Sequence, residues 1–144
     1  KNIQQIKTEV LVNKGLCYCS MKKLDESLDC FNKALNLIES GGNTLKKVTA
    51  DALNAKGIVY NKKCTDSLEL YKNHSKIYKN LSENFGKNCN CKNNKSKNHD
   101  NVKEIYAEKQ KVFKENAQKS VEYFNKSLDI RKLLYTSIFS KQYC

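Results

Sequence analysis

The sequence has no proline, no tryptophan and only five glycines in 144 residues. This scarcity of turn-forming residues favours helices joined by short connections. No apolar run approaches the ~20 residues that a membrane-spanning helix requires, and no signal peptide is visible, so we expect no membrane association. The length predicts one domain. Because the chain runs from Lys1 to Cys144 and stops within an unfinished helical pattern, we interpret it as a piece of a longer protein.

Arginine is also nearly missing, since Arg131 is the only arginine among 27 basic residues. The net charge of +12 raises the question of nucleic acid as a partner. Arginine is favoured for bidentate contacts to phosphate and guanine, so a surface that relies on lysine argues against specific readout of nucleic acid. Abundant asparagine with little arginine is moreover the composition that codon bias in an AT-rich genome produces. A lysine-rich nucleic-acid-binding module therefore stays the alternative interpretation.

Signals for metal binding and catalysis are weak. The seven cysteines are an odd number without regular spacing, which indicates a reducing, cytoplasmic compartment. Cys89, Cys91 and His99 do not have the spacing of a structural zinc site, so we expect no metal and no cofactor. With two histidines, no phosphate-binding loop and no nucleophile elbow, the chain is not expected to be an enzyme.

The apolar residues recur with helical spacing over most of the chain. The first helix is expected over 3–20, and the pattern resumes at Leu24 after a turn at Lys22 and Lys23. Gly41 and Gly42 are expected to end the second helix. Further helices are predicted at about 44–62, 67–81, 101–114 and 117–139. Residues 84–99, rich in Asn and Lys, are predicted to form a low-complexity loop.

Two short patterns recur, which is typical of repeat proteins. Residues 11–18 (LVNKGLCY) return as residues 53–60 (LNAKGIVY). A serine followed four residues later by an aromatic residue appears three times, at Ser27 and Phe31, at Ser67 and Tyr71, and at Ser120 and Phe124. Glycine inside a helix costs ~1 kcal/mol relative to alanine, so a close approach of a second helix is expected at Gly15 and Gly57.

These residues resemble the tetratricopeptide repeat, in which two antiparallel helices pack at a tight crossing. The resemblance covers most of the chain and is similar to the extended repeats of kinesin light chains. It implies a right-handed α-α superhelix of about three helical hairpins, with repeats at about 3–40, 44–82 and 101–139 within one domain, 1–144. The third repeat departs from the pattern because Gln110 stands at the position of the glycine.

The resemblance also implies a function. Proteins of this family commonly hold a peptide or a partner helix on a concave face lined by the first helix of each repeat, so we expect a non-catalytic protein-interaction scaffold. Carried over by position, the partner-binding residues are Glu9, Val12, Asn13, Leu16 and Ser20, then Asp51, Asn54, Ile58 and Asn61. The last predicted helix carries further apolar residues, Leu133, Leu134, Ile138 and Phe139, which indicate self-association or contact with a partner.

Overall fold

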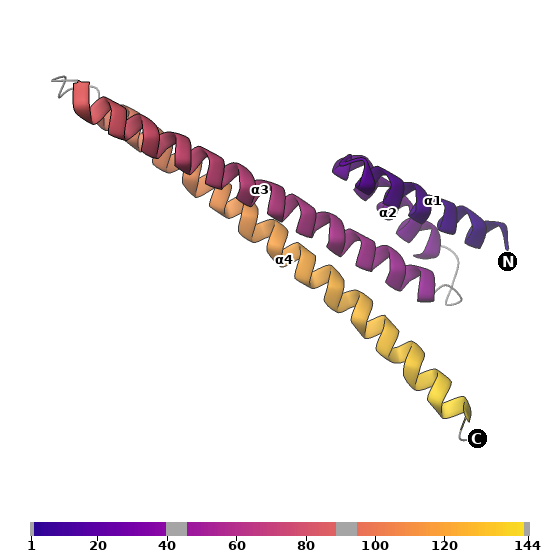
Figure 1. Ribbon diagram of the computed structural model, residues 1–144. Coiled ribbons are helices and arrows are strands. Elements are labelled where there is room, and N and C mark those ends of the chain that lie inside the picture. The colour runs from indigo at the N-terminus through magenta and orange to yellow at the C-terminus, as the bar shows by residue number, and fades with distance from the viewer. Residues whose placement is uncertain (1, 40–45, 89–94, 143–144) are drawn as a thin grey trace. The chain divides into compact units, whose positions relative to one another are not determined.

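The computed structural model of the chain describes residues 2–39, 46–88 and 95–142. Helix is the only regular secondary structure in these ranges, which confirms the all-α prediction. Figure 1 shows the four helices of the described ranges, which are α1 (Ile3–Ser20), α2 (Leu24–Glu39), α3 (Lys46–Asn88) and α4 (Lys95–Gln142).

A tight turn joins α1 to α2. The backbone of Lys22 is left-handed, with φ of 60°. The N–H of Lys23 donates to the Tyr18 carbonyl at 2.9 Å, and the N–H of Lys22 donates to the Cys19 carbonyl at 3.2 Å. These two bonds close the end of α1, where the residue after the C-cap Met21 is left-handed, a position where glycine is preferred. The turn predicted at Lys22 and Lys23 is confirmed.

The helix ends predicted after residues 62 and 114 are wrong, because α3 and α4 continue through both points. The segment 63–66 contains no proline or glycine. Two hydroxyl groups here donate to backbone carbonyls of the same helix. Thr65 Oγ1 donates to Lys62 at 2.9 Å, and Ser67 Oγ donates to Lys63 at 2.8 Å. The predicted loop 84–99 is helical at both ends, to Asn88 and from Lys95. Its middle, 89–94, lies outside the described residues.

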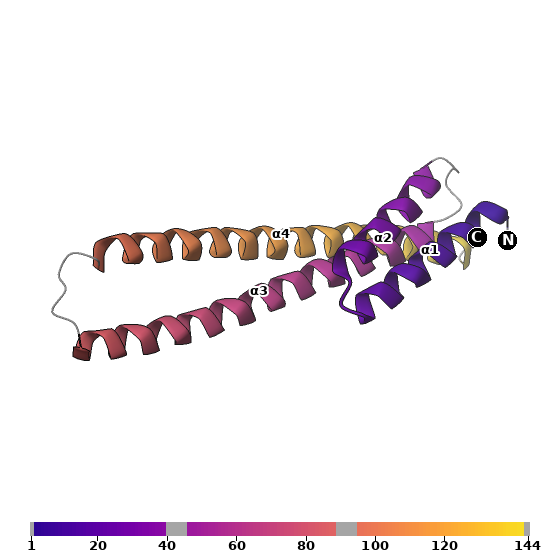
Figure 2. The same cartoon turned by 90° about the horizontal axis from the view of Figure 1, so that it is seen from above.

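Contacts between Cα atoms divide the chain into two units, and α3 and α4 contribute to both. Unit 1 comprises Lys1–Asn61 and Gln118–Cys144, so it holds α1, α2, the beginning of α3 and the end of α4. Unit 2 comprises Lys62–Ala117. Within each unit the segments of α3 and α4 lie side by side and run in opposite directions (Figures 1 and 2).

Unit 1 contains a close approach between α1 and α2, which we call the first lock (Gly15, Ser27 and Phe31). A Cβ atom added at Gly15 would lie 2.6 Å from Cε1 of Phe31, whose side chain is fully buried. The Ser27 hydroxyl is also buried and donates to the Gly15 carbonyl at 2.7 Å. The prediction that a second helix packs on Gly15 is therefore confirmed.

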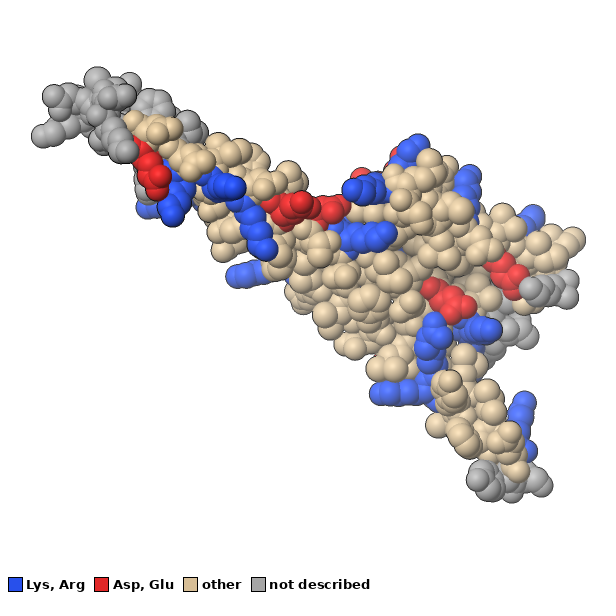
Figure 3. All heavy atoms as spheres, viewed as in Figure 1, with Lys and Arg blue, Asp and Glu red and all other residues tan. Residues whose placement is uncertain are grey.

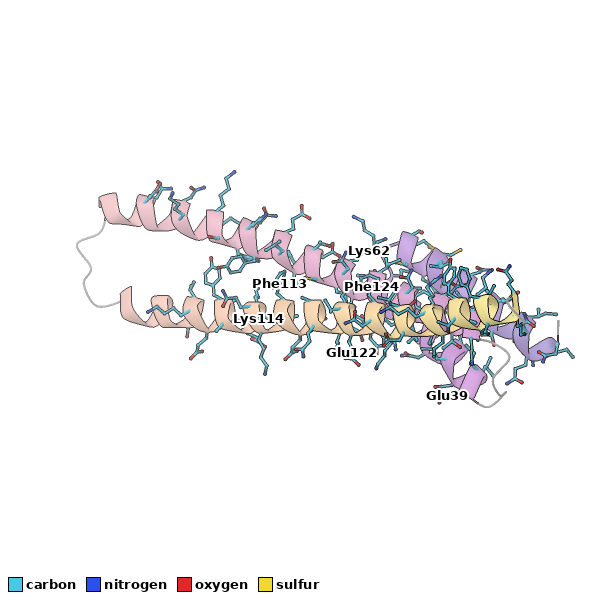
Figure 4. The ribbon with its side chains drawn as sticks, turned by 90° about the horizontal axis from the view of Figure 1, so that it is seen from below. Glu39, Lys62, Phe113, Lys114, Glu122 and Phe124 are labelled. Carbon is cyan, nitrogen blue, oxygen red and sulfur yellow. The ribbon has the colours of Figure 1, made fainter. Side chains whose placement is uncertain are left out.

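The same geometry recurs between α3 and α4 in what we call the second lock (Gly57, Ser120 and Phe124). A Cβ atom at Gly57 would lie 2.6 Å from Cδ1 of Phe124, and the Ser120 hydroxyl donates to the Gly57 carbonyl at 2.9 Å. Figure 4 shows Phe124 between the two helices. The helix that packs on Gly57 is thus the end of α4, and not residues 67–82 as the sequence pattern predicted.

Each lock has a further pair of buried positions, seven residues after its serine and seven residues before its glycine. In α4, the Ser127 hydroxyl is 2% exposed and donates to the Ala50 carbonyl at 2.8 Å. The corresponding positions of the first lock are Ala34 and Thr8, and both are fully buried. This agreement over two helical turns indicates that α1 with α2, and the start of α3 with the end of α4, are two copies of the same helical pair.

The core of unit 1 joins these two pairs. Its buried residues come from α1, α2 and α3 and are Val12, Cys19, Leu28, Phe31, Ala34, Ala52, Ala55 and Val59. Small residues dominate the α3 contribution, which lets the helix backbones approach closely. Because Val12 and Ala55 lie in one cluster, the first helices of the two pairs pack against the same core.

Unit 2 is an antiparallel helical hairpin held by a narrow seam. Its less exposed side chains include Cys64, Ser67 and Tyr71 on α3, and Val102, Tyr106, Lys109 and Phe113 on α4. The alternating spacing of three and four residues is typical of a coiled-coil seam. Tyr71 and Tyr106 meet edge to face, with ring centroids 5.2 Å apart, and Phe113 points toward α3 (Figure 4).

Candidate functional site

The candidate residues on α1 fall into two groups. Asn13, Leu16 and Ser20 are exposed, with Leu16 43% accessible, and their spacing of three and four residues puts them on one face. Val12 is only 7% exposed and belongs to the core, so its side chain is not on an accessible surface. Glu9 is half-buried and accepts a hydrogen bond from Gln5 at 3.2 Å.

The candidate residues on α3 show a similar division. Asn54 is half-buried, Ile58 is 38% exposed and Asn61 is exposed, and their spacing of four and three residues puts them on one face. Asp51 instead forms an ion pair with Arg131 of α4, at 2.8 Å between Oδ1 and the guanidinium. This contact assigns Asp51 a role in holding α3 to α4.

The exposed residues of both helices border the shared core. Leu16 follows Val12 by one turn, and Ile58 follows Ala55 by three residues, while Val12 and Ala55 are buried in the same cluster. Since residues three or four apart lie on one side of a helix, Leu16 and Ile58 lie at the edge of the region where α1 and α3 meet the core. The geometry offers two partly exposed apolar side chains beside asparagine amides, which can both donate and accept hydrogen bonds.

Sequence reasoning missed a cluster of lysine and tyrosine in unit 1. Tyr60 of α3 and Tyr123 of α4 stack with ring centroids 5.5 Å apart and planes at 9°. Lys56 is 7% exposed, lies 4.2 Å from the Tyr123 centroid and donates to Asn32 Oδ1 of α2 at 2.7 Å. Lys119 lies 5.4 Å from the Tyr60 centroid. Ring stacking and cation–π contacts link α3 to α4, and the Lys56 hydrogen bond links both to α2.

Ionisation in this region follows simple pairing. The Lys126 ammonium donates to Glu122 Oε1 at 2.6 Å, and this hydrogen bond lowers the pKa of Glu122 and raises the pKa of Lys126. A hydrogen bond from Lys33 to Asp29 likewise raises the pKa of Lys33. All these groups are exposed. The pKa shifts of Glu122, Lys126 and Lys33 therefore favour the charged form of each side chain.

The remaining chemistry of the described residues is sparse. No group of three or more His, Cys, Asp and Glu side chains that could hold a metal ion occurs among them. Cys89 and Cys91 lie outside the described residues. In the part of the chain that the structure describes, no helix has the length and hydropathy needed to cross a bilayer. Figure 3 shows basic side chains dispersed over the visible face, without the single stripe expected of a phosphate-tracking surface.

Comparison with protein families identifies part of the chain. Residues 8–80, half of the chain, match the tetratricopeptide repeat family. No curated protein and no solved structure matches the chain. The matched range includes both glycines of the two locks, whose close packing explains why the repeat carries glycine inside a helix. Repeats of this family are protein-interaction modules and are typically not catalytic. On the matched range and the paired helices, the chain belongs to the tetratricopeptide repeat family.

Proposed function

We propose that this chain is a non-catalytic scaffold that binds a peptide or a partner helix on the surface formed by the first helices of its two helical pairs. The proposed contact residues are Asn13, Leu16 and Ser20 of α1 with Asn54, Ile58 and Asn61 of α3. The observation that carries the proposal is the exposure of Leu16 and Ile58, 43% and 38%, beside the buried Val12 and Ala55. The family supplies the prior expectation of a protein partner.

Affinity at such a surface would come from the apolar side chains, and orientation from the amides. Burial of a leucine or isoleucine side chain contributes about 1.5–3 kcal/mol. Asparagine side chains can satisfy both the N–H and the carbonyl of an extended backbone. Val12 lies in the core and supports the surface from behind, whereas Asp51 pairs with Arg131.

A peptide-display selection against the intact chain tests the proposal. Binding of a selected peptide is expected to weaken at least about tenfold for Leu16→Ser combined with Ile58→Ser, and to be unchanged for Asn36→Ala on α2. Asn36 is exposed, which makes it a matched surface control. Selected peptides whose binding ignores Leu16 and Ile58 would count against the proposed surface.

The salt dependence of binding distinguishes the scaffold from the alternative, a nucleic-acid-binding module. Binding that neutralises phosphates weakens steeply as the salt concentration rises, because counterions are released. Tight RNA binding at physiological salt, unaffected by Leu16→Ser and Ile58→Ser, would favour the alternative over the scaffold.

We also propose self-association through the end of α4. Tyr135, Ile138 and Phe139 are 63%, 54% and 56% exposed, and their spacing of three and four residues puts them on one face. A second copy of the chain would cover this apolar face. Sedimentation equilibrium is expected to give a dimer that Ile138→Ser with Phe139→Ser converts to monomer. A wild-type chain that is monomeric at all concentrations would contradict self-association.

A further inference from the structure

α1 carries an exposed apolar face that its own helical pair does not use. Ile6, Val10 and Cys17 follow one another by four and seven residues, so they lie on one side of the helix. Ile6 is 48% and Val10 is 58% exposed, and Cys17 is exposed as well. The side of α1 that packs on α2 is a different one and contains Gly15. The exposed side is therefore accessible to another molecule.

The same side of α3 is buried. In the two copies of the helical pair, each residue of α1 corresponds to the residue 42 positions later in α3, as Gly15 corresponds to Gly57. The counterparts of the exposed apolar residues of α1 are Val48, Ala52 and Val59. Ala52 and Val59 are fully buried in the core of unit 1, and Val48 packs against that core. In α3, this side of the helix thus forms the contact with the preceding helical pair.

The end of α4 exposes the other half of such a contact. Each residue of α2 corresponds to the residue 93 positions later in α4, as the serine of the first lock corresponds to the serine of the second. Leu28 is buried in the core that α3 shares, and Leu35 packs against it. Their counterparts, Val121 and Leu128, are 58% and 48% exposed. The surface that α2 presents to α3 is therefore repeated on α4, where it is uncovered.

A polar contact between α2 and α3 is repeated as well. Lys56 of α3 donates a hydrogen bond to Asn32 Oδ1 of α2 at 2.7 Å. By the same correspondence, the counterpart of Lys56 is Lys14 on α1, and the counterpart of Asn32 is Asn125 on α4. Both counterparts are exposed. If α1 of one chain lay on α4 of another as α3 lies on α2, Lys14 would reach Asn125.

We propose that the exposed face of α1 packs on the end of α4 of a second copy of this chain, head to tail, as α3 packs on α2 within the chain. The second copy is the occupant because one chain carries both halves of the contact, apolar residues and the lysine–asparagine pair included. The two halves lie on different helices, so the contact is heterologous and can extend from copy to copy. Apolar outer faces on a stack of repeats favour such further stacking.

One difference from the internal contact makes the association weaker. Asn13 of α1 stands where α3 has Ala55, which is 4% exposed. Burial of an amide costs free energy unless the amide finds a hydrogen-bond partner. We therefore expect the contact between chains to form only at high protein concentration.

This contact is distinct from the self-association proposed for Tyr135, Ile138 and Phe139. α2 ends at Glu39, whose counterpart on α4 is Lys132, so those three residues lie beyond the part of α4 that corresponds to α2. The dimer at the end of α4 is expected at lower concentrations than the head-to-tail contact. Either association can fail without the other.

The experiment is a complementation test by sedimentation equilibrium. Every chain carries Ile138→Ser with Phe139→Ser, which removes the contact proposed for the end of α4. The mass of this parent chain is expected to rise steadily with concentration up to about 1 mM, because each copy offers both halves. Val10→Glu blocks one half and Val121→Glu blocks the other, at two residues of equal exposure. Each variant alone should associate at least about tenfold more weakly, because a carboxylate replaces an apolar contact.

An equimolar mixture of the two variants is the decisive sample. The Val10→Glu chain keeps its α4 face and the Val121→Glu chain keeps its α1 face, so we expect a 1:1 heterodimer that does not grow further. Leu70→Glu is the matched control, because Leu70 is 56% exposed and belongs to unit 2, and it should associate like the parent chain. Circular dichroism verifies that each variant keeps its helix content.

The heterodimer also tests the register. Lys14→Ala in the Val121→Glu chain and Asn125→Ala in the Val10→Glu chain should each weaken it about fivefold, through loss of one hydrogen bond. The two together should weaken it hardly more than either one, because they remove the same bond.

Several outcomes would overturn the proposal. One is a parent chain that stays monomeric at every concentration, and another is a mixture of the two variants that does not form a heterodimer. Association that survives either Val10→Glu or Val121→Glu would also overturn it, because the contact would then not join α1 to α4. Additive effects of Lys14→Ala and Asn125→Ala would do the same, because the contact would then not repeat the one between α2 and α3.

Discussion

Gly57 of α3 and Phe124 of α4 pack so closely that an added Cβ atom at Gly57 would lie 2.6 Å from the Phe124 ring. Ser120 reinforces the contact by donating to the Gly57 carbonyl, although the two residues are 63 positions apart in the sequence. In the first helical pair, the equivalent serine and glycine are only 12 positions apart. The second repeat therefore combines the beginning of α3 with the end of α4. Residues 62–117, which form a unit of their own, lie between these two segments in the sequence.

The two locks predict unequal effects of the same substitution. Gly15→Ala should lower the free energy of unfolding by about 1–3 kcal/mol, because the Phe31 ring is fully buried and cannot move aside. Gly57→Ala should cost less, since Phe124 is half-buried and can tilt. Urea denaturation measures both, with Asn36→Ala as a control at an exposed helical position. A Gly15→Ala chain as stable as wild type would refute the first lock.

The turn between α1 and α2 predicts a stabilising substitution. Lys22 has φ of 60°, a left-handed conformation that disfavours side chains with a Cβ atom. Lys22→Gly should raise the free energy of unfolding by about 0.5–1 kcal/mol. Lys23→Gly is the matched control, because Lys22 is the only described non-glycine residue with positive φ. Equal effects of the two substitutions on the urea midpoint would contradict the turn geometry.

Cysteine reactivity reports on the seam of unit 2. Burial raises the pKa of the Cys64 thiol, and its residue is 8% exposed, whereas Cys17 is exposed. Because the thiolate is the reactive form, Cys17 should be alkylated at least about tenfold faster than Cys64 at neutral pH. The rate at Cys64 should also level off at a higher pH than in urea-unfolded chain. Peptide mapping after timed alkylation measures both rates, and faster labelling of Cys64 would contradict its burial.

Excision of unit 2 is predicted to leave a folded pair of repeats. Replacing residues 63–116 by Met-Lys-Lys, the residues that join α1 to α2, restores between Gly57 and Ser120 the spacing found between Gly15 and Ser27. The shortened chain should unfold cooperatively, with both locks intact. A matched control replaces 21–23 by Gly-Gly-Gly in the full chain. A shortened chain without a cooperative transition would show that unit 1 depends on unit 2.

Much of the first helical pair could be predicted from the sequence. The recurring strings at 11–18 and 53–60 located both glycines, and the spacing of Ser27 and Phe31 identified the packing partner of Gly15 correctly. These signals are local: the helix period, the turn at Lys22 and the lock span fewer than forty residues. Interactions between residues this close in the sequence leave a local pattern of residue types, which can be recognised without a structure.

The partner of Gly57 could not be predicted in the same way. Ser67 with Tyr71 and Ser120 with Phe124 spell the same pattern, and the sequence does not rank them. The choice depends on whether the chain turns after residue 62. The turn that does follow Ser20 also lacks glycine and proline, so the absence of these residues after residue 62 does not show that the helix continues there. The groove lined by Ser67, Leu70, Ile105, Glu108, Lys109 and Val112 was not predicted either, because it forms only where α3 and α4 lie side by side.

The central claim, that Gly57 packs on Phe124 and not on Tyr71, is tested most directly by double-mutant cycles on unfolding free energy. Gly57→Ala is combined with Phe124→Leu in one cycle and with Tyr71→Leu in the other. Residues in contact typically show coupling of about 0.5–3 kcal/mol, and distant ones add within about 0.3–0.5 kcal/mol. We expect coupling in the Phe124 cycle alone. Coupling in the Tyr71 cycle, with none for Phe124, would contradict the interrupted repeat.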